Sequence, residues 1–256
     1  MKRTDIQFLS PREPVHMADE WFGLISADHF WFKRRFEVFR KFAGSSLDPA
    51  EKLAEVGCGS GVLQRQIEEW LGRGVDGFDL NEGSLAENQS RRSRLFYYNI
   101  YDCREEFRAR YDAVILFDVL EHVDDDLELL KTLRFYLNER GVIYVNVPAL
   151  PALYSRYDEV AGHLRRYVSG TLAEKAQAAG FKMTRWTYWG FPLLPLLWAR
   201  KRLLKFKDKK DVIEFGFSRR NPFLNQLLYF LACGERIPQQ VSGTSLMALL
   251  VPAASR

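Results

Sequence analysis

Residues 55–61 read Glu-Val-Gly-Cys-Gly-Ser-Gly, and this stretch decides the fold. Residues 52–56, Lys-Leu-Ala-Glu-Val, predict a short buried strand, and the apolar spacing from Val62 onward predicts a helix. Three glycines at alternate positions let the backbone turn tightly and let a ligand lie against bare amides. The helix N-terminus adds free N–H groups and partial positive charge, which suit a carboxylate or phosphate. Dinucleotide-binding proteins use the same physics, so the turn alone does not identify its ligand.

The composition is that of a folded protein. With 256 residues, 47% of them hydrophobic, the chain can build one large α/β domain or one domain with a sizeable insertion. Its three cysteines (58, 103 and 233) have no metal spacing, and we expect neither a disulfide framework nor a zinc site. The first residues lack the apolar run of a signal peptide, and no segment has about 18 consecutive apolar residues. We therefore expect a cytoplasmic protein.

Seven predicted strands alternate with helices along most of the chain. The strands are expected at 52–56, 74–79, 95–102, 111–118, 141–147, 181–189 and 245–251. The helices are expected from Val62, over 81–94 and 124–138, and from the capping-box pattern Thr171 to Glu174, with Gly180 as a stop. This alternation predicts a Rossmann-like α/β fold, with a seven-stranded, mostly parallel sheet covered by helices on both faces.

Two further segments are expected to flank this core. Residues 1–45 combine a polar arm with a helix whose Phe32, Phe36, Phe39 and Phe42 share one face, which either packs on the domain or forms a lid. Residues 191–244 are too many for an ordinary loop, so we expect a helical insertion there, between the sixth and seventh strands. The core is then 46–190 together with 245–256.

The positive charge of the chain is concentrated in the insertion. The net charge is +4, but residues 200–210 hold seven basic side chains and one acidic one. A helix from Leu196 would carry an apolar stripe with basic residues beside it, which is typical of a segment that lies on a membrane surface. We therefore name 191–210 as a candidate contact with the inner face of a membrane. A packed helix with a solvated charged edge and a nucleic-acid patch are the alternatives. A second helix, around 224–231, is expected to complete the cap.

Acidic residues follow the ends of the predicted strands, where ligands bind in parallel sheets. With the glycine turn, with Asp79 eighteen positions after Gly61, and with 117–122 (Phe-Asp-Val-Leu-Glu-His), the sequence resembles class I S-adenosylmethionine-dependent methyltransferases over roughly 51–251. The Leu-Glu-His run is similar to the small-molecule subgroup that includes ubiquinone-type O-methyltransferases. Residues 29–35 and 162–167 are similar to bacterial members that accompany glycan or lipid assembly.

The resemblance implies S-adenosylmethionine as cofactor and S-adenosylhomocysteine as product. It implies that Asp79 binds the ribose hydroxyls and Asp102 the adenine amino group, that Glu55 lies near the ammonium group, and that the backbone after Phe117 holds the methionyl end. The expected cofactor-binding residues are Glu55, Gly57, Cys58, Gly59, Gly61, Asp79, Leu80, Asp102, Asp118 and Val119. An ionised carboxylate only accepts hydrogen bonds, which suits both partners expected for the aspartates. Purely structural strand-end or helix-cap roles stay open for these acids.

A hydroxyl acceptor needs a base, and four histidines are available. His163, in the loop after the fifth strand, is the preferred catalytic residue, and His122 is the second candidate. His29 is expected at the lid, and His16 is set aside. The expected acceptor contacts are Tyr154, Tyr157, Arg166 and Tyr167.

Each of these roles has a structural alternative. In the alternative for the loop, Asp158 or Glu159 forms an ion pair with Arg165 or Arg166. In the alternative for His122, its side chain caps the next helix. Glu121 with His122 gives too few ligands to predict a metal site.

The function predicted is methyl transfer, by in-line displacement, to a hydroxyl of a small-molecule or lipid- or glycan-linked acceptor. The chain lacks the Asn- or Asp-Pro-Pro-aromatic motif that methyltransferases of nucleic-acid amino groups carry after the fourth strand, which argues against nucleic acid as the substrate. A cofactor-binding regulatory protein without turnover is the first alternative. A nucleotide-dependent oxidoreductase is the second, although its glycine pattern is different and it leaves 118–122 unexplained.

Overall fold

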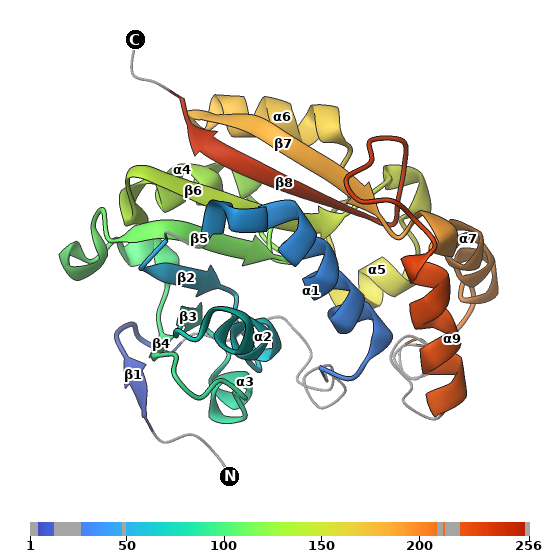
Figure 1. Ribbon diagram of the computed structural model, residues 1–256, viewed down its shortest axis with the longest axis horizontal. Helices are drawn as coiled ribbons and strands as arrows, with labels where there is room; N and C mark the ends of the chain where they lie inside the picture. The colour runs from blue at the N-terminus through green and yellow to red at the C-terminus, as the bar shows by residue number, and fades with distance from the viewer. Residues whose placement is uncertain (1–4, 13–26, 48–49, 209–211, 213–220, 254–256) are drawn as a thin grey trace.

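The computed structural model describes residues 5–12, 27–47, 50–208, 212 and 221–253 of the chain. Its centre is one sheet with the strand order β1-β4-β3-β2-β5-β6-β8-β7, in which only β8 runs antiparallel to its neighbours (Figure 1). The strands are β1 (Ile6–Phe8), β2 (Leu53–Val56), β3 (Asp76–Asp79), β4 (Leu95–Tyr97), β5 (Tyr111–Phe117), β6 (Leu137–Pro148), β7 (Phe181–Trp189) and β8 (Ser245–Pro252). The Rossmann-like, mostly parallel sheet is confirmed.

Helices cover both faces of this sheet. The α-helices are α1 (Phe30–Ala43), α2 (Val62–Leu71), α3 (Glu82–Ala86), α4 (Asp126–Tyr136), α5 (Arg156–Ala161), α6 (Ser169–Ala178), α7 (Leu194–Leu203) and α9 (Pro222–Cys233). Short 3-10 helices lie at η2 (Gly44–Leu47), η3 (Ile100–Asp102), η4 (Glu105–Phe107), η5 (Pro151–Leu153) and η6 (Phe191–Leu193). None of the helices within these described ranges is long and apolar enough to cross a membrane.

The central strand β5 shows why helices are needed on both sides. Its residues Ala113, Ile115 and Phe117 pack in one buried cluster with side chains of α1 and α2. The alternate residues Val114 and Leu116 pack in a second cluster with side chains of α4 and α6. An unbroken apolar strand therefore buries both of its faces, as expected for the centre of a parallel sheet.

The sheet has eight strands and not seven. The additional strand β1 pairs in parallel with β4 at the sheet edge and comes from the polar arm of the chain. Three residues are too few to show an apolar alternation, which is why the sequence did not reveal this strand. The predicted helical face of α1 is confirmed, since Phe32, Phe39 and Phe42 are buried. His16 and residues 209–210 of the basic segment lie outside the described residues.

Two predicted helices have different limits. The helix expected over 81–94 ends at Ala86, because the carboxylate of Glu68 accepts backbone N–H groups of residues 91–93 and holds that segment as a loop. The helix expected from Thr171 begins at Ser169. The Thr171 hydroxyl instead accepts the N–H of Val168 at 3.2 Å, inside the first turn.

Candidate active site

The glycine turn connects β2 to α2 at the carboxyl end of the sheet. Gly57 has a φ of +75°, and a Cβ there would lie 2.4 Å from Cγ2 of Val119, so this close approach requires glycine. The N–H groups of the three glycines are used within the protein, on Phe78 O, on Asp79 Oδ2 and on Cys58 O. The expectation of bare amides at the glycines is therefore wrong. What the turn offers is backbone without side chains.

Asp79 ends β3, but Asp102 lies in η3, beyond the end of β4 at Tyr97, so the strand expected over 95–102 is shorter than predicted. The carboxylate of Asp79 accepts from the N–H of Gly59 at 2.7 Å and from that of Asn81 at 2.8 Å, and burial raises its pKa against the effect of these bonds. Asp102 is exposed in η3 and accepts from the hydroxyl of Ser10 at 2.5 Å. Ser10, which lies two positions after the end of β1, thus holds the side chain of Asp102 in place.

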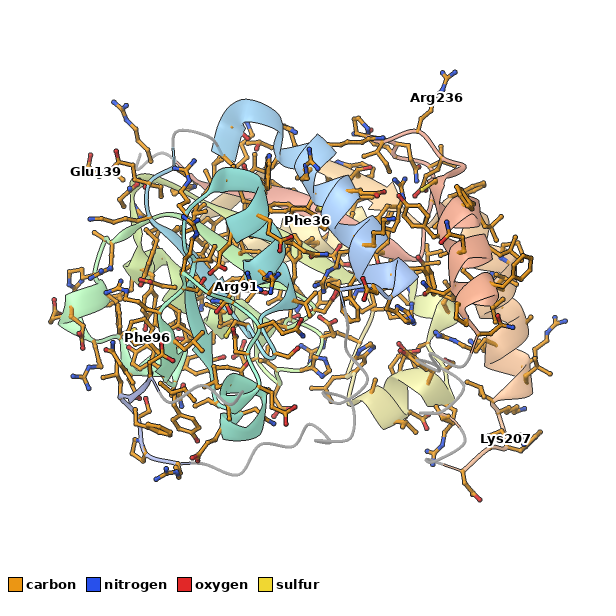
Figure 2. The ribbon with its side chains drawn as sticks, turned by 60° about the horizontal axis from the view of Figure 1, so that its bottom comes forward. Phe36, Arg91, Phe96, Glu139, Lys207 and Arg236 are labelled. Atoms are coloured by element: carbon orange, nitrogen blue, oxygen red, sulfur yellow. The ribbon has the colours of Figure 1, made fainter. Side chains whose placement is uncertain are left out.

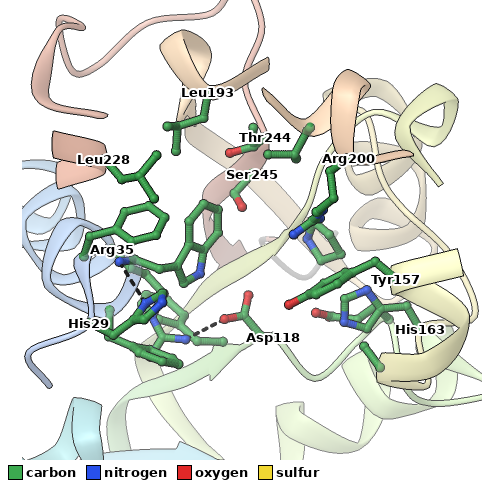
Figure 3. Close-up of a pocket in the computed structure, with 18 of the residues that line it drawn as sticks. His29, Arg35, Asp118, Tyr157, His163, Leu193, Arg200, Leu228, Thr244 and Ser245 are labelled. Carbon is green, nitrogen blue, oxygen red and sulfur yellow. Dashed lines mark hydrogen bonds and ion pairs between the residues drawn. The ribbon is translucent and has the colours of Figure 1, made fainter. Parts of the chain in front are cut away.

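A polar chain links helix α1 to the end of β5 and to β6 and β7. Arg35 of α1 donates to Asp118 Oδ2 at 2.5 Å (Figure 3). Asn146 of β6 donates to Asp118 Oδ1 at 2.6 Å. Asn146 accepts in turn from Trp189 Nε1 of β7 at 2.9 Å. Asp118 itself has a φ of +56°, a left-handed conformation that aspartate tolerates better than most residues. These contacts fix α1 over the carboxyl ends of the strands.

Glu55 is buried beside this chain. It is 4% exposed, and its Oε2 has no hydrogen-bond partner among the described residues. Burial raises the pKa of Glu55 to about 8, and the nearby Arg35 opposes the shift only in part. A buried carboxyl without a second partner is suited to a ligand that brings a positive charge. Cys58, next in this turn, is also buried, which raises the pKa of its thiol and makes it unreactive.

The loop after β6 builds a second group of polar residues around Asp158, which is fully buried in α5. Its carboxylate accepts from His163 Nδ1 at 2.9 Å and from Arg166 Nε at 2.8 Å. Burial acts to raise the pKa of Asp158, but the hydrogen bond from His163 and the charge of Arg166 lower it to about 2. The expected ion pair in this loop is therefore Asp158 with Arg166, while Arg165 pairs with Asp126 at 3.2 Å.

His122 packs against His163, with ring centroids 4.9 Å apart. Burial, followed by the effect of His163, lowers the pKa of His122 to about 4, and its Nδ1 lies 3.1 Å from the carbonyl oxygen of Gly162. Glu121 is buried, with both carboxyl oxygens unpartnered among the described residues. Ligand atoms of Glu121, His122 and His163 all lie within 4.8 Å of one another, so the structure adds a third candidate metal ligand to the two recognised in the sequence.

A cavity of about 940 Å³ joins these groups beneath α1, α7 and α9. Arg35 and His29 approach it from the side of α1, Tyr157, His163 and Arg200 from the opposite side, and Asp118 lies between them (Figure 3). Leucines of η6, α7 and α9, among them Leu193, Leu196, Leu197, Leu204, Leu224 and Leu228, form its apolar wall. The predicted helical insertion therefore does border a cavity.

The structure brings nine of the predicted site residues to this cavity: Glu55, Gly57, Cys58, Gly59, Asp118, His122, Tyr157, His163 and Arg166. Five others do not line it: Asp79, Leu80 and Val119 lie at or just after strand ends, Gly61 is the N-cap of α2, and Asp102 lies in η3. Tyr154 donates its hydroxyl to His163 O at 2.8 Å, and Tyr167 lies in the core with its hydroxyl on Asp126. The predicted ligand contacts of these seven residues stay predictions.

Sequence reasoning did not assign a role to Arg35, Asn146 or Arg200. Arg35 is the last residue of a stretch already noticed for its resemblance, and its place one helical turn after Trp31 would have suggested a shared face. Asn146 is a polar residue inside an apolar strand, which is a recognisable anomaly. Arg200 was indistinguishable from its basic neighbours.

A sequence model of the methyltransferase domain family matches residues 27–185. The mitochondrial ubiquinone biosynthesis O-methyltransferase of Saccharomyces cerevisiae is 27% identical over 106 residues, 38% of this chain and 34% of the relative. A probable S-adenosylmethionine-dependent methyltransferase of Mycolicibacterium smegmatis is 25% identical over 163 residues, 62% of each chain. The ubiquinone biosynthesis O-methyltransferase of Haemophilus ducreyi is 26% identical over 159 residues, 57% of this chain and 65% of the relative. The chain thus spans from about a third to just under two thirds of the length of these relatives.

Solved structures show the same fold at lower identity. A SAM-dependent methyltransferase from Archaeoglobus fulgidus superposes with a TM-score of 0.54 at 15% identity, covering 87% of this chain and 96% of that one. The cyclase SpnF superposes with a TM-score of 0.57 at 16% identity, covering 88% and 82%. A cyclase among these structures shows that the fold alone does not determine the reaction. Since the family model covers more than half of the sequence, the chain belongs to the class I S-adenosylmethionine-dependent methyltransferase family.

Proposed function

We propose that the protein transfers a methyl group from S-adenosylmethionine to a hydroxyl oxygen of a small-molecule or lipid-linked acceptor. The observation that carries this proposal is the arrangement of the cavity. Glu55 and the glycine turn lie on its sheet side, and the pair His163–Asp158 lies on its loop side. A methyl donor and a base on two sides of one cavity suit an in-line displacement.

The residues present fit the cofactor. The carboxyl group of Glu55, buried and with one oxygen unpartnered, suits the methionyl ammonium group. Arg35 suits the methionyl carboxylate, although it has to share its charge with Asp118. The side-chain-free backbone at Gly57 and Gly59 allows close approach. In this proposal Asp79 binds the ribose and Asp102 the adenine, outside the cavity.

S-adenosylmethionine supplies a methyl group on a positively charged sulfur. The chain itself has to hold the acceptor in line and take up the hydroxyl proton. His163 suits this role because its Nδ1 donates to the buried Asp158, which leaves Nε2 as the proton acceptor. His122, with its pKa lowered to about 4 chiefly by burial, is the weaker base.

The apolar wall of the cavity favours a hydrophobic acceptor. Leucines of α7 and α9 line the cavity, and exposed apolar side chains continue onto the outer surface of the cap, with Phe206 89% and Phe223 76% exposed. Exposed basic residues, Arg202, Lys205 and Lys207, flank them. We propose that this surface rests on the anionic inner face of a membrane, where a lipid-linked acceptor enters the cavity. The names of the relatives, which concern ubiquinone biosynthesis, agree with an acceptor of this kind.

Calorimetric titration with S-adenosylhomocysteine, and with NADH as the comparison ligand, tests the cofactor. We expect micromolar-range binding of the first ligand only, and its loss in Asp79→Ala, whose carboxylate both closes the glycine turn and faces the ribose in this proposal. Asp112→Ala is the matched control, because this strand aspartate bonds to the backbone of residues 51 and 52, away from the cavity. No binding of S-adenosylhomocysteine to the wild type would overturn the proposal and favour an interaction protein.

A further inference from the structure

Arg200 is a cation without an acidic partner. No carboxylate among the described residues lies within ion-pair distance of its guanidinium, and its Nε is buried without a hydrogen bond. The guanidinium carbon lies instead 3.8 Å from the ring centroid of Tyr157. Burial, with Arg166 acting in the same direction, lowers the pKa of Arg200, yet a guanidinium stays charged at neutral pH. Arg200 is half-buried, and a partly desolvated charge without a counter-charge is costly unless a ligand supplies one.

The acids around Arg200 are already committed. Asp158 is shared between Arg166 and His163, and Glu159 of the same helix pairs with Arg156 at 2.8 Å. Neither carboxyl oxygen of Glu121 bonds to a described residue, so Glu121 does not pair with Arg200. Of the two guanidinium groups at the Asp158 end of the cavity, that of Arg166 is therefore paired with a carboxylate and that of Arg200 is not, among the described residues.

The surroundings make this charge effective. Arg200, Arg166 and Tyr157 all line the cavity, and leucines of η6 and α7 flank them. Burial raises the pKa of Tyr157 to about 12, so its phenol remains a hydrogen-bond donor. An anion here would meet a guanidinium and an O–H group in an environment with little water, where charge-assisted hydrogen bonds are strong. Arg35, which suits the cofactor, lies on the opposite side (Figure 3).

We infer that Arg200, with Arg166 and Tyr157, forms an anion subsite, and that the acceptor is an amphipathic molecule with a carboxylate or phosphate group. Its apolar part lies along the leucines of α7 and α9. The inference rests on the proposed function in one respect: that the bound anion is the methyl acceptor. Binding of an anion at the subsite does not depend on turnover. The subsite restricts the proposed class of small or lipid-linked acceptors to those that carry an acidic group.

The test uses three soluble probes of equal chain length: octyl phosphate, octanoate and octanol. Each is titrated calorimetrically into the protein saturated with S-adenosylhomocysteine. We expect at least one anion to bind about tenfold or more tightly than octanol, and that probe identifies phosphate or carboxylate as the preferred group. In Arg200→Gln this preference disappears, and Arg200→Lys retains part of it. Arg202→Gln is the matched control, since Arg202 is an exposed residue of the same helix and does not line the cavity.

Equal affinity for all three probes, absence of anion binding, or an unchanged preference in Arg200→Gln would each overturn the inference. S-adenosylhomocysteine binding is measured separately for every variant. If that ligand fails to bind the wild type, the proposed function fails, and the probes are then titrated into the free protein. An anion preference lost in Arg200→Gln would still establish the subsite in that case.

Discussion

The surroundings of the glycine turn and the cap of this molecule are built in opposite ways. Around the glycine turn, most polar side chains form at least one hydrogen bond within the protein. An example is the chain from Trp189 through Asn146 and Asp118 to Arg35. On the cap, α7 and α9 expose large apolar side chains, including Leu203 at 65% and Phe230 at 62%. The family model ends at residue 185, before the cap begins. The family model therefore covers Arg35, Asp118 and Asn146 but not the apolar surface of the cap.

Catalysis is expected where the two regions meet, at His163. His163→Ala should lower kcat for methyl transfer by about 10²- to 10⁴-fold, because the base is lost, and should leave the Kd of S-adenosylhomocysteine unchanged. Transfer of tritium from labelled S-adenosylmethionine to an acceptor measures this. His122→Ala is the control and should cost much less. An unchanged kcat in His163→Ala would show that His163 is not the base, and would leave the loop side of the cavity without its proposed catalytic role.

The turn itself should tolerate no side chain. Gly57→Ala should lower the free energy of unfolding by about 2–4 kcal/mol, the sum of a left-handed alanine and of overlap with Val119. Gly170→Ala is the control, because a Cβ at this position of α6 meets nothing within 4 Å. It should change the free energy of unfolding by less than about 1 kcal/mol. Urea unfolding measures both, and equal effects would show that the turn is not packed as described.

Glu55 should make cofactor binding depend on pH. Its pKa of about 8, raised chiefly by burial, keeps it protonated in the free protein at neutral pH, so binding an ammonium group releases a proton. The affinity for S-adenosylhomocysteine should then fall below pH 8 by up to about tenfold per pH unit, and Glu55→Gln should remove this dependence.

The same shift predicts a dependence of stability on pH. A folded pKa above the unfolded value of 4.5 means that this carboxyl group stabilises the fold fully below pH 4.5, and that its contribution is lost as the pH rises through about 8. Compared with Glu55→Gln, the wild type should lose stability across this window in urea titrations. A parallel pH profile of the two proteins would contradict the burial of an unpartnered carboxyl group.

The smallest effect is expected on the cap. Replacing Phe223 and Phe230 together by serine should weaken binding to anionic phospholipid vesicles about threefold to tenfold, because both rings are largely exposed and available for insertion. Phe8→Ser is the control, a 44% exposed phenylalanine of β1 on the opposite side of the molecule (Figure 1). Sedimentation with vesicles gives the partition. An equal loss of vesicle binding in both variants would mean that the apolar surface of the cap does not bind the membrane specifically.

The sequence was informative where a feature is contiguous. The glycine turn, the unbroken apolar run of β5 and the full length of β7 each lie in one short segment, so local pattern was enough. The Asp158–Arg166 pair could also be anticipated, because its members share one loop. The early end of α3 could not, since it depends on Glu68 of a different helix.

The site required contacts between distant segments. Arg35 and Asp118 are 83 positions apart, and Ser10 and Asp102 are 92 apart, so no local pattern pairs them. Arg200 is distinctive only because no carboxylate among the described residues pairs with it. In the sequence it is one of a run of basic residues and cannot be told from its neighbours. Lys207 of the same run is exposed at the edge of the molecule (Figure 2), whereas Arg200 is half-buried.

The attachment of α1 to α9 has a consequence for ligand binding. Asn225 of α9 accepts the N–H of Phe30 at 2.8 Å, Tyr229 bonds to Glu37, and Arg34 pairs at 3.3 Å with Glu235 just beyond α9. Helix α1 brings Arg35 to the cavity, and α9 brings Leu224 and Leu228 to it. If the cofactor binds at Arg35 and the acceptor along these leucines, as proposed, a shift of one helix on binding would strain the contacts that hold the other. By thermodynamic reciprocity, each ligand would then change the affinity of the other by the same factor, through the two helices as well as through their contact at the methyl group.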